Sequence, residues 1–162
     1  MFQKKYTQVN VRLICIGKTD DNRIESLFLE YENRLKHYTN FKSEFLVLKK
    51  KSKEVDQVKI EEGQLILQKV EKSSFLILLD EQGRAYDSVK FSAFLQKRMN
   101  SGLKEVVFLI GGAHGFSPAV YERANSKVAL SSLTFTHQMV RLVFIEQLYR
   151  AFTILKGEKY HH

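Results

Sequence analysis

Residues 106–115, which read VVFLIGGAHG, decide the fold class of this 162-residue chain. The first five of them are apolar, as in a strand that is buried on both faces of a sheet. Such strands belong to parallel sheets with helices on both sides. Glycines follow directly, and glycine serves where the backbone turns tightly or approaches a ligand closely. The stretch therefore predicts a parallel α/β sheet with a functional loop at the carboxyl end of this strand.

The rest of the chain alternates strand and helix patterns around this stretch. Strand patterns cover residues 9–16, 45–48, 74–79, 106–110 and 127–130. Helical spacing of apolar residues covers 24–38, 55–70, 89–99 and 137–156, and Ser117-Pro118 starts a further helix. Residues 81–84 form a predicted turn. This alternation predicts an α/β fold, a mostly parallel sheet flanked by helices.

Length and composition favour one domain over residues 1–162. The chain has 8 Gly and 1 Pro and no repeat, so no linker divides it. Residues 1–8 are polar and are expected to form a loose N-terminal extension. The lone Cys15 cannot form an internal disulfide, which favours a reducing compartment.

The charge balance points to a polyanionic partner. Lys and Arg number 26 and Asp and Glu number 18, giving 26 − 18 = +8. Such an excess favours nucleic acid or an anionic surface, although it also serves solubility. Lys49, Lys50, Lys51 and Lys53 form a basic loop that either contacts phosphates or is a solvated turn. No membrane-spanning run and no signal peptide are present in the sequence, so a cytoplasmic protein without membrane contact is expected.

Three polar or glycine-rich segments follow predicted strands. Asp80 follows the third strand, and residues 111–115, which we call the glycine loop, follow the fourth. Residues 130–137 follow the last strand. Parallel α/β sheets bind ligands at the carboxyl ends of their strands, so these segments predict a site. The glycine loop matches neither the Walker nor the dinucleotide pattern, and a tight structural turn explains it equally well. Residues 130–137 offer hydroxyls and backbone groups for a planar base, or simply cap the next helix.

The last helix, from His137, is apolar on more than one face. A helix of this kind is buried on two sides, which predicts a homodimer. His137 and Arg141 share one face, whereas Glu146 and Arg150 have the spacing of a simple helix salt bridge. No histidine has the spacing of a zinc ligand and no nucleophilic triad is evident, so no metal is expected.

Taken together, the segments resemble the ribosomal large-subunit pseudouridine N3-methyltransferase family of the SPOUT superfamily. The resemblance covers residues 9–162. It rests on ICIGK at 14–18, EEG at 61–63, LD at 79–80, FLIGG at 108–112, LTF with His137, EQLYRA at 146–151, and Gly157 with Tyr160-His161.

This resemblance implies a sheet whose C-terminal part is threaded into a trefoil knot, which is a rare topology. It further implies a homodimer that methylates N3 of a pseudouridine in helix 69 of 23S rRNA on the assembled 70S ribosome. The implied methyl donor is S-adenosyl-L-methionine, with no metal. By position, the donor site carries over to these residues: Leu79, Gly111, Leu130, Ser131, Ser132, Leu133, Thr134 and Phe135.

The sequence departs from the family at two places. Residues 1–8 precede the usual start, and Thr136 stands where the family commonly has proline. Proline fixes φ and lacks an N–H, so Thr136 either loosens the loop or caps the helix.

The expected catalytic groups follow from the charge that develops when the acceptor nitrogen loses its proton. A cation or donor beside the flanking oxygens stabilises that charge. The candidates are Arg141, His137, Tyr160 and His161, with His161 favoured as the base because histidine titrates near neutral pH. The tail is expected to reach the partner subunit's site. Two alternatives stay open, a SPOUT enzyme acting on tRNA and a non-catalytic basic ribosome-binding factor.

Overall fold

The computed structural model describes residues 9–162, so the expected N-terminal extension lies outside the described residues. In this part the elements alternate along the chain. They are β1 (Asn10–Ile16), α1 (Asn22–Leu35), β2 (Asn40–Leu46), α2 (Val55–Lys69), β3 (Phe75–Ala85), α3 (Ser88–Met99), β4 (Glu105–Ile110), α4 (Pro118–Arg123), β5 (Ser126–Ala129) and α5 (His137–Lys156).

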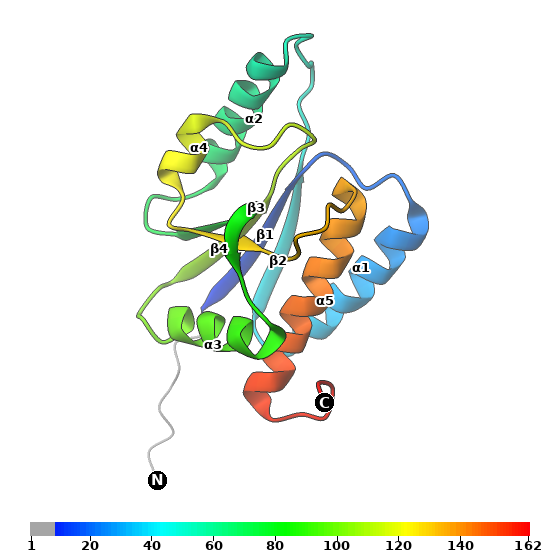
Figure 1. Cartoon of the computed structure of the whole chain (residues 1–162), viewed down its shortest axis with the longest axis vertical. Coiled ribbons are helices and arrows are strands. Elements are labelled where there is room, and N and C mark those ends of the chain that lie inside the picture. Colours follow the sequence, from blue (N-terminus) through cyan, green and yellow to red (C-terminus); the bar gives the residue numbers. More distant parts are fainter. Residues whose placement is uncertain (1–8) are drawn as a thin grey trace.

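All five strands run parallel in one sheet, in the order β2-β1-β4-β3-β5 (Figure 1). β4 lies at the centre of the sheet, as its continuous apolar run predicts. The parallel α/β fold is therefore confirmed. The threading of the C-terminal segment stays a prediction.

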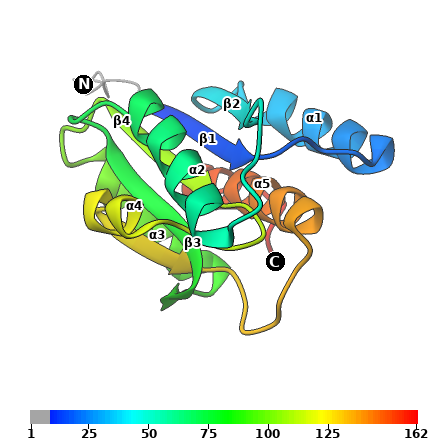
Figure 2. The same cartoon turned by 90° about the horizontal axis from the view of Figure 1, so that it is seen from above.

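Helices cover both faces of the sheet (Figure 2). Val11, Leu13 and Cys15 of β1 pack into the core beneath α1, α3 and α5. Ile14 and Ile16 point to the other face, into the core beneath α2 and α4. The alternation follows from the period of two in a strand. Burial raises the pKa of the Cys15 thiol to about 12, so this cysteine is an inert core residue.

The long last helix has the ends that the sequence predicts. The side chain of Thr136 accepts a hydrogen bond from the N–H of Met139 at 3.2 Å. Gly157 closes the helix in the left-handed conformation with φ 69°. Thr136 therefore caps α5, which settles what it does in place of proline.

The second strand begins earlier than predicted. The sequence indicated residues 45–48, but β2 spans Asn40–Leu46 and pairs with β1 from Asn10 onward. β2 is an edge strand, so its polar residues tolerate solvent and hide the strand pattern. The apolar residue at position 47 is 43% exposed and lies outside the strand.

The predicted turn at 81–84 is wrong. β3 continues through these residues to Ala85, with a shift in its pairing to β5 between Leu79 and Arg84. A Cβ on Gly83 would stand 2.6 Å from the backbone nitrogen of Val128. Glycine in a strand marks such a close backbone approach, so the residue type that suggested a turn instead permits the irregular pairing.

Candidate functional site

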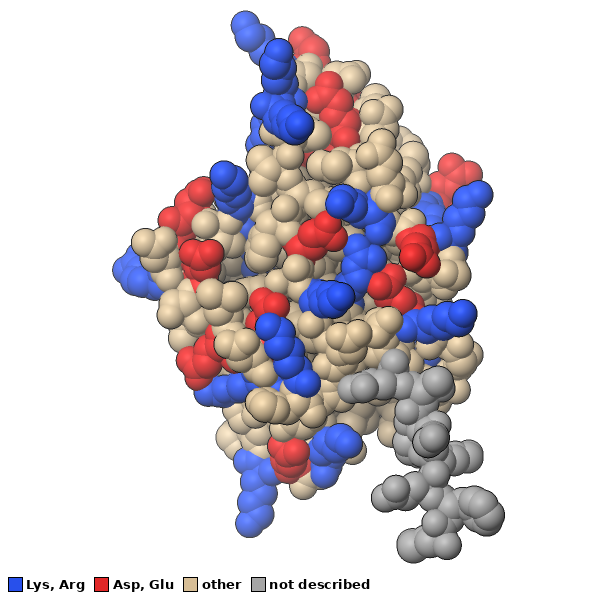
Figure 3. Space-filling model, turned by 180° about the vertical axis from the view of Figure 1, so that it is seen from behind, with Lys and Arg blue, Asp and Glu red and all other residues tan. Residues whose placement is uncertain are grey.

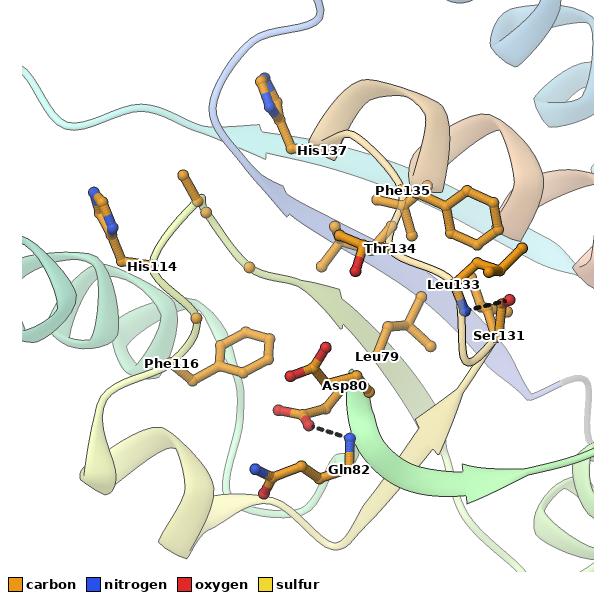
Figure 4. Close-up of a pocket in the computed structure, with 18 of the residues that line it drawn as sticks. Leu79, Asp80, Gln82, His114, Phe116, Ser131, Leu133, Thr134, Phe135 and His137 are labelled. Atoms are coloured by element: carbon orange, nitrogen blue, oxygen red, sulfur yellow. Dashed lines mark hydrogen bonds between the residues drawn. The ribbon is translucent and has the colours of Figure 1, made fainter.

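A cavity of about 630 Å³ lies at the carboxyl edge of the sheet, beside the ends of β4 and β5 and beside residues 79–82 within β3 (Figure 4). We call it the edge pocket. The residues that line it are Leu79, Asp80, Glu81, Gln82, Ile110, Gly111, Gly112, Ala113, His114, Gly115, Phe116, Tyr121, Leu130, Ser131, Leu133, Thr134, Phe135, His137 and Val140. Three segments that the sequence placed at strand ends therefore meet around one cavity, and the volume suits a small organic ligand.

Most residues carried over from the family line this pocket. Ser132 is the exception among the expected donor-site residues, since it is exposed and lies outside the lining set. Of the expected catalytic residues, His137 lines the pocket, whereas Arg141, Tyr160 and His161 do not. In Figure 4, His114 and His137 stand at one rim, while Thr134 and Asp80 point toward the open space.

The glycine loop is both a tight turn and a closely packed wall. The N–H of Gly115 donates to the carbonyl of Gly112 at 3.3 Å, and Gly115 has φ +78°. A Cβ on Gly111 would lie 2.9 Å from the ring of Phe116. A Cβ on Gly112 would lie 2.9 Å from a carboxylate oxygen of Glu62. Glycine therefore avoids close contacts with Phe116 and Glu62 at two points of the loop and backbone strain at a third.

Asp80 is fixed by two hydrogen bonds. The N–H of Gln82 donates to Oδ1 at 2.8 Å, and the hydroxyl of Tyr121 donates to Oδ2 at 2.5 Å. Burial and the neighbouring Asp80 raise the pKa of Tyr121 to about 12, so the hydroxyl keeps its proton near neutral pH. Sequence reasoning placed Asp80 at a strand end but did not assign it a role. It missed Tyr121, because the two residues are 41 positions apart and no local pattern links them.

Arg141 is fully buried and is not among the residues that line the edge pocket. Its guanidinium donates to the carbonyl of Ile16 at 2.7 Å and to the hydroxyl of Thr19 at 2.9 Å. It also lies over the ring of Phe45, 5.4 Å from the centroid. Arg141 thus ties α5 to the segment that follows β1, and burial lowers its pKa.

Tyr160 and His161 belong to a second group of side chains, the tail cluster, with Glu146 and Arg150. Tyr160 donates to a carboxylate oxygen of Glu146 at 2.9 Å, and Arg150 donates to the same oxygen at 2.6 Å. Nη1 of Arg150 lies 3.3 Å from Nδ1 of His161. The supposed helix salt bridge is therefore the anchor of the C-terminal tail.

The tail cluster is well separated from the edge pocket of the same chain. Glu146 lies nine residues after His137, which is about 14 Å along a helix axis at 1.5 Å per residue. Arg150 lies a further turn away. The structure therefore does not bring His137 together with Tyr160 and His161 within one chain.

A family model described as "Predicted SPOUT methyltransferase" matches residues 9–161. This chain belongs to the SPOUT methyltransferase family. Membership confirms the expected fold class and a methyltransferase that uses S-adenosylmethionine.

Relatives of known name match along almost the whole chain. A protein of Christiangramia forsetii named "Ribosomal RNA large subunit methyltransferase H" is 54% identical, over 95% of this chain and 99% of its own. One of the same name from Flavobacterium johnsoniae is 51% identical over the same shares. Among solved structures, the SpoU methyltransferase AviRb from Streptomyces viridochromogenes in complex with AdoMet has a TM-score of 0.47 and 12% identity, covering 94% of this chain and 60% of that one.

The residues of the edge pocket fit such a donor. Leu79, Phe116 and Phe135 offer apolar surface to a planar base, and the loop at 130–135 offers backbone groups at its edge. Within residues 9–162, no three His, Cys, Asp or Glu side chains lie together as a metal site. In the same part of the chain, no helix has the length and hydropathy to cross a bilayer.

Proposed function

We propose that this protein methylates N3 of a pseudouridine in helix 69 of 23S rRNA, acting as a homodimer on the assembled 70S ribosome in the cytoplasm. The observation that carries the proposal is the meeting of segments from β3, β4 and β5 around one cavity in a SPOUT chain. The named relatives act on ribosomal RNA of the large subunit, according to their names. The particular nucleotide is the one that the family resemblance implies.

The charge distribution supports a large RNA partner. The chain carries +8, and Lys49, Lys50, Lys51 and Lys53 are all exposed in the segment between β2 and α2. Figure 3 shows Lys and Arg side chains projecting at the tip of the molecule where this segment lies. Lysines there are free to contact phosphates, and such contacts supply affinity and make it sensitive to salt.

The chemistry demands little covalent work from the protein. When bound, S-adenosylmethionine supplies a methyl group already activated on its sulfonium. The chain must hold the acceptor nitrogen in line with that group, exclude water and accept the proton that N3 loses. His137 at the pocket rim is available to the acceptor. We assign to His161 the role of the base that accepts the proton from N3. Its imidazole is held beside Arg150.

Because the tail cluster is remote from the pocket of its own chain, His161 and Tyr160 must act on the partner's pocket. Two exposed apolar side chains, one that lines the pocket and one in the first turn of α5, support a covering partner. Leu133 is 77% exposed and Met139 is 40% exposed. Side chains of this size gain free energy when a second subunit buries them. The dimer therefore completes each site in this proposal.

Arg141 is assigned a positioning role. Its bonds to Ile16 and Thr19 fix the start of α5, and hence His137, relative to the sheet. Direct stabilisation of the acceptor by Arg141 stays a prediction.

The test is methyl transfer to purified acceptors. We expect the protein with labelled S-adenosylmethionine to methylate 70S ribosomes that lack the modification, and not free tRNA. The variant Thr134→Trp fills the pocket and should abolish transfer. Its control is Ser132→Trp, in the same exposed loop but outside the lining set, which should retain activity. Transfer to tRNA alone would assign another substrate. Ribosome binding without donor binding would make the protein a binding factor.

A further inference from the structure

The edge pocket differs in charge from the rest of the molecule. The chain carries +8 overall, yet the residues that line the pocket include two carboxylates, Asp80 and Glu81, and no lysine or arginine. A chain with a net positive charge thus places two carboxylates, and no basic side chain of Lys or Arg, around this pocket. The field in such a cleft favours cations and disfavours phosphate groups.

Asp80 and Glu81 form what we call the acidic wall of the pocket. Hydrogen bonds hold the Asp80 carboxylate in place. Its two oxygens each accept one hydrogen bond, from the N–H of Gln82 and the hydroxyl of Tyr121. A carboxylate oxygen can accept a second bond, so each keeps capacity to face a ligand. Figure 4 shows the Asp80 side chain pointing into the space opposite Thr134, near Phe116. The charge is therefore held in place before any ligand enters, and no reorganisation is needed on binding.

We propose that Asp80, assisted by Glu81, makes the pocket discriminate the charged methyl donor from the uncharged product. The inference rests on the proposed function, in which S-adenosylmethionine occupies this pocket. During transfer the bond between the methyl carbon and sulfur breaks and its electron pair stays on sulfur. The methyl carbon bonds to N3, which loses its proton to a base. The sulfonium thereby becomes a neutral thioether, and the ligand loses one positive charge.

The consequence is a pocket that binds its donor and releases its product. Attraction between Asp80 and the sulfonium is present before transfer and absent after it. The adenosine, the ribose hydroxyls and the amino-acid end are common to both molecules and cannot distinguish them. The acidic wall also disfavours entry of RNA phosphates, so the acceptor must present a base rather than its backbone.

Tyr121 is a positioning residue in this arrangement. Its hydroxyl acts on the ligand only through Asp80, which it holds from α4. Removing the Tyr121 hydroxyl leaves the negative charge of Asp80 in place but no longer holds that carboxylate in one orientation. We therefore expect Tyr121→Phe to weaken donor binding less than loss of the Asp80 charge does.

The test is calorimetric titration of the full-length protein with three ligands. These are S-adenosylmethionine, S-adenosylhomocysteine and an analogue with a protonated amine in place of the sulfonium. For Asp80→Asn we expect the Kd of both cationic ligands to rise about tenfold, a size reasonable for one charge at close range in a partly solvated site. The Kd of the neutral product should change less than twofold. The control Glu122→Gln removes a neighbouring exposed carboxylate outside the lining set and should change none of them.

Tyr121→Phe supplies a second measurement. The ratio of product Kd to donor Kd should fall in the order wild type, Tyr121→Phe, Asp80→Asn. Equal weakening of donor and product by Asp80→Asn would overturn the inference and assign Asp80 to a part common to both, such as the ribose. Failure of the wild-type protein to bind any of the three ligands would overturn the proposed function itself.

Discussion

Arg141 was expected to be catalytic from the sequence, but its contacts in the structure are those of a residue that holds elements together. From the sequence it was a catalytic candidate, because its cation lies one turn after His137. In the structure it is completely buried and bonded to Ile16 and Thr19. A buried guanidinium of this kind holds elements together, and removing it leaves the Ile16 carbonyl without its donor.

We predict that Arg141→Ala lowers the free energy of unfolding by about 2–4 kcal/mol, since it leaves a cavity and an unpaired buried carbonyl. Denaturant titration measures the change, with Arg23→Ala as the control, since the Arg23 side chain is 89% exposed. Unchanged stability together with loss of methyl transfer would return Arg141 to a direct catalytic role.

Glu62 is a second residue whose burial has a measurable effect. Only 6% of it is exposed, and burial raises the pKa of its carboxyl, opposed in part by Lys51 and His114. A raised folded-state pKa means that the folded protein favours the neutral form of this carboxyl over the ionised form. Its ionisation therefore costs stability as pH rises above the unfolded-state pKa, and the cost is complete above the folded-state pKa.

We predict that Glu62→Gln is more stable than the wild type at pH 8 and that this advantage vanishes near pH 4, where both side chains are neutral. Unfolding midpoints across this range test it, and Glu61→Gln is the neighbouring control. An advantage that grows toward low pH would contradict the sign.

At the scale of elements, the glycine loop depends on the helix behind it. A Cβ on Gly112 would lie 2.9 Å from a carboxylate oxygen of Glu62 in α2, so this buried side chain would have to shift. The loop's position is therefore coupled to α2 through this contact.

We predict that Gly112→Ala weakens donor binding about tenfold, from a displacement that costs on the order of 1–2 kcal/mol. In a Glu62→Ala background the same change should cost much less, because the obstacle is gone. Calorimetry on the four proteins of this double-mutant cycle measures the coupling. Additive effects would show that the contact does not govern the loop.

The elements differ in how well the sequence predicted them. β4 and α5 were predicted within a residue, because burial on both faces and clear helix caps leave strong local signals. The start of β2 and the continuation of β3 were missed, since both depend on pairing with distant strands. The same division holds at the site. The segments after the predicted strands indicated the pocket. Tyr121 joins its lining, and Glu62 packs behind Gly112, through contacts between distant residues that no local pattern encodes.

At the scale of the whole molecule, a site completed in trans makes inactive subunits complement each other. Take Thr134→Trp, which blocks the pocket, and a chain lacking residues 160–162, which lacks the tail. Each homodimer should be inactive. In a 1:1 mixture of exchanging subunits, half the dimers are mixed, and each has one intact pocket facing one intact tail.

We therefore predict about a quarter of wild-type methyl transfer in that mixture, for a symmetric two-site dimer. The separate proteins, assayed at the same total concentration, are the controls. A tail that acts within its own chain would give no activity in the mixture.

Binding to the ribosome should depend strongly on salt. Replacing Lys49, Lys50, Lys51 and Lys53 with glutamine should reduce the slope of log affinity against log salt by about 0.7–0.9 for each lysine that contacts a phosphate. Filter binding at several ionic strengths measures the slope. An unchanged slope would make the segment a solvated turn.

The unbroken helix α5 carries His137 at its first turn and anchors the tail on Glu146 and Arg150 further along. In the proposed dimer, α5 therefore sets the distance between the pocket residue His137 and the anchor of the tail. One residue inserted between His137 and Glu146 would move Glu146 about 1.5 Å along the helix axis and rotate it by about 100° about that axis. The surface loops can change length without such an effect. We therefore expect methyl transfer to depend more on the length of α5 between His137 and Glu146 than on any single side chain between them.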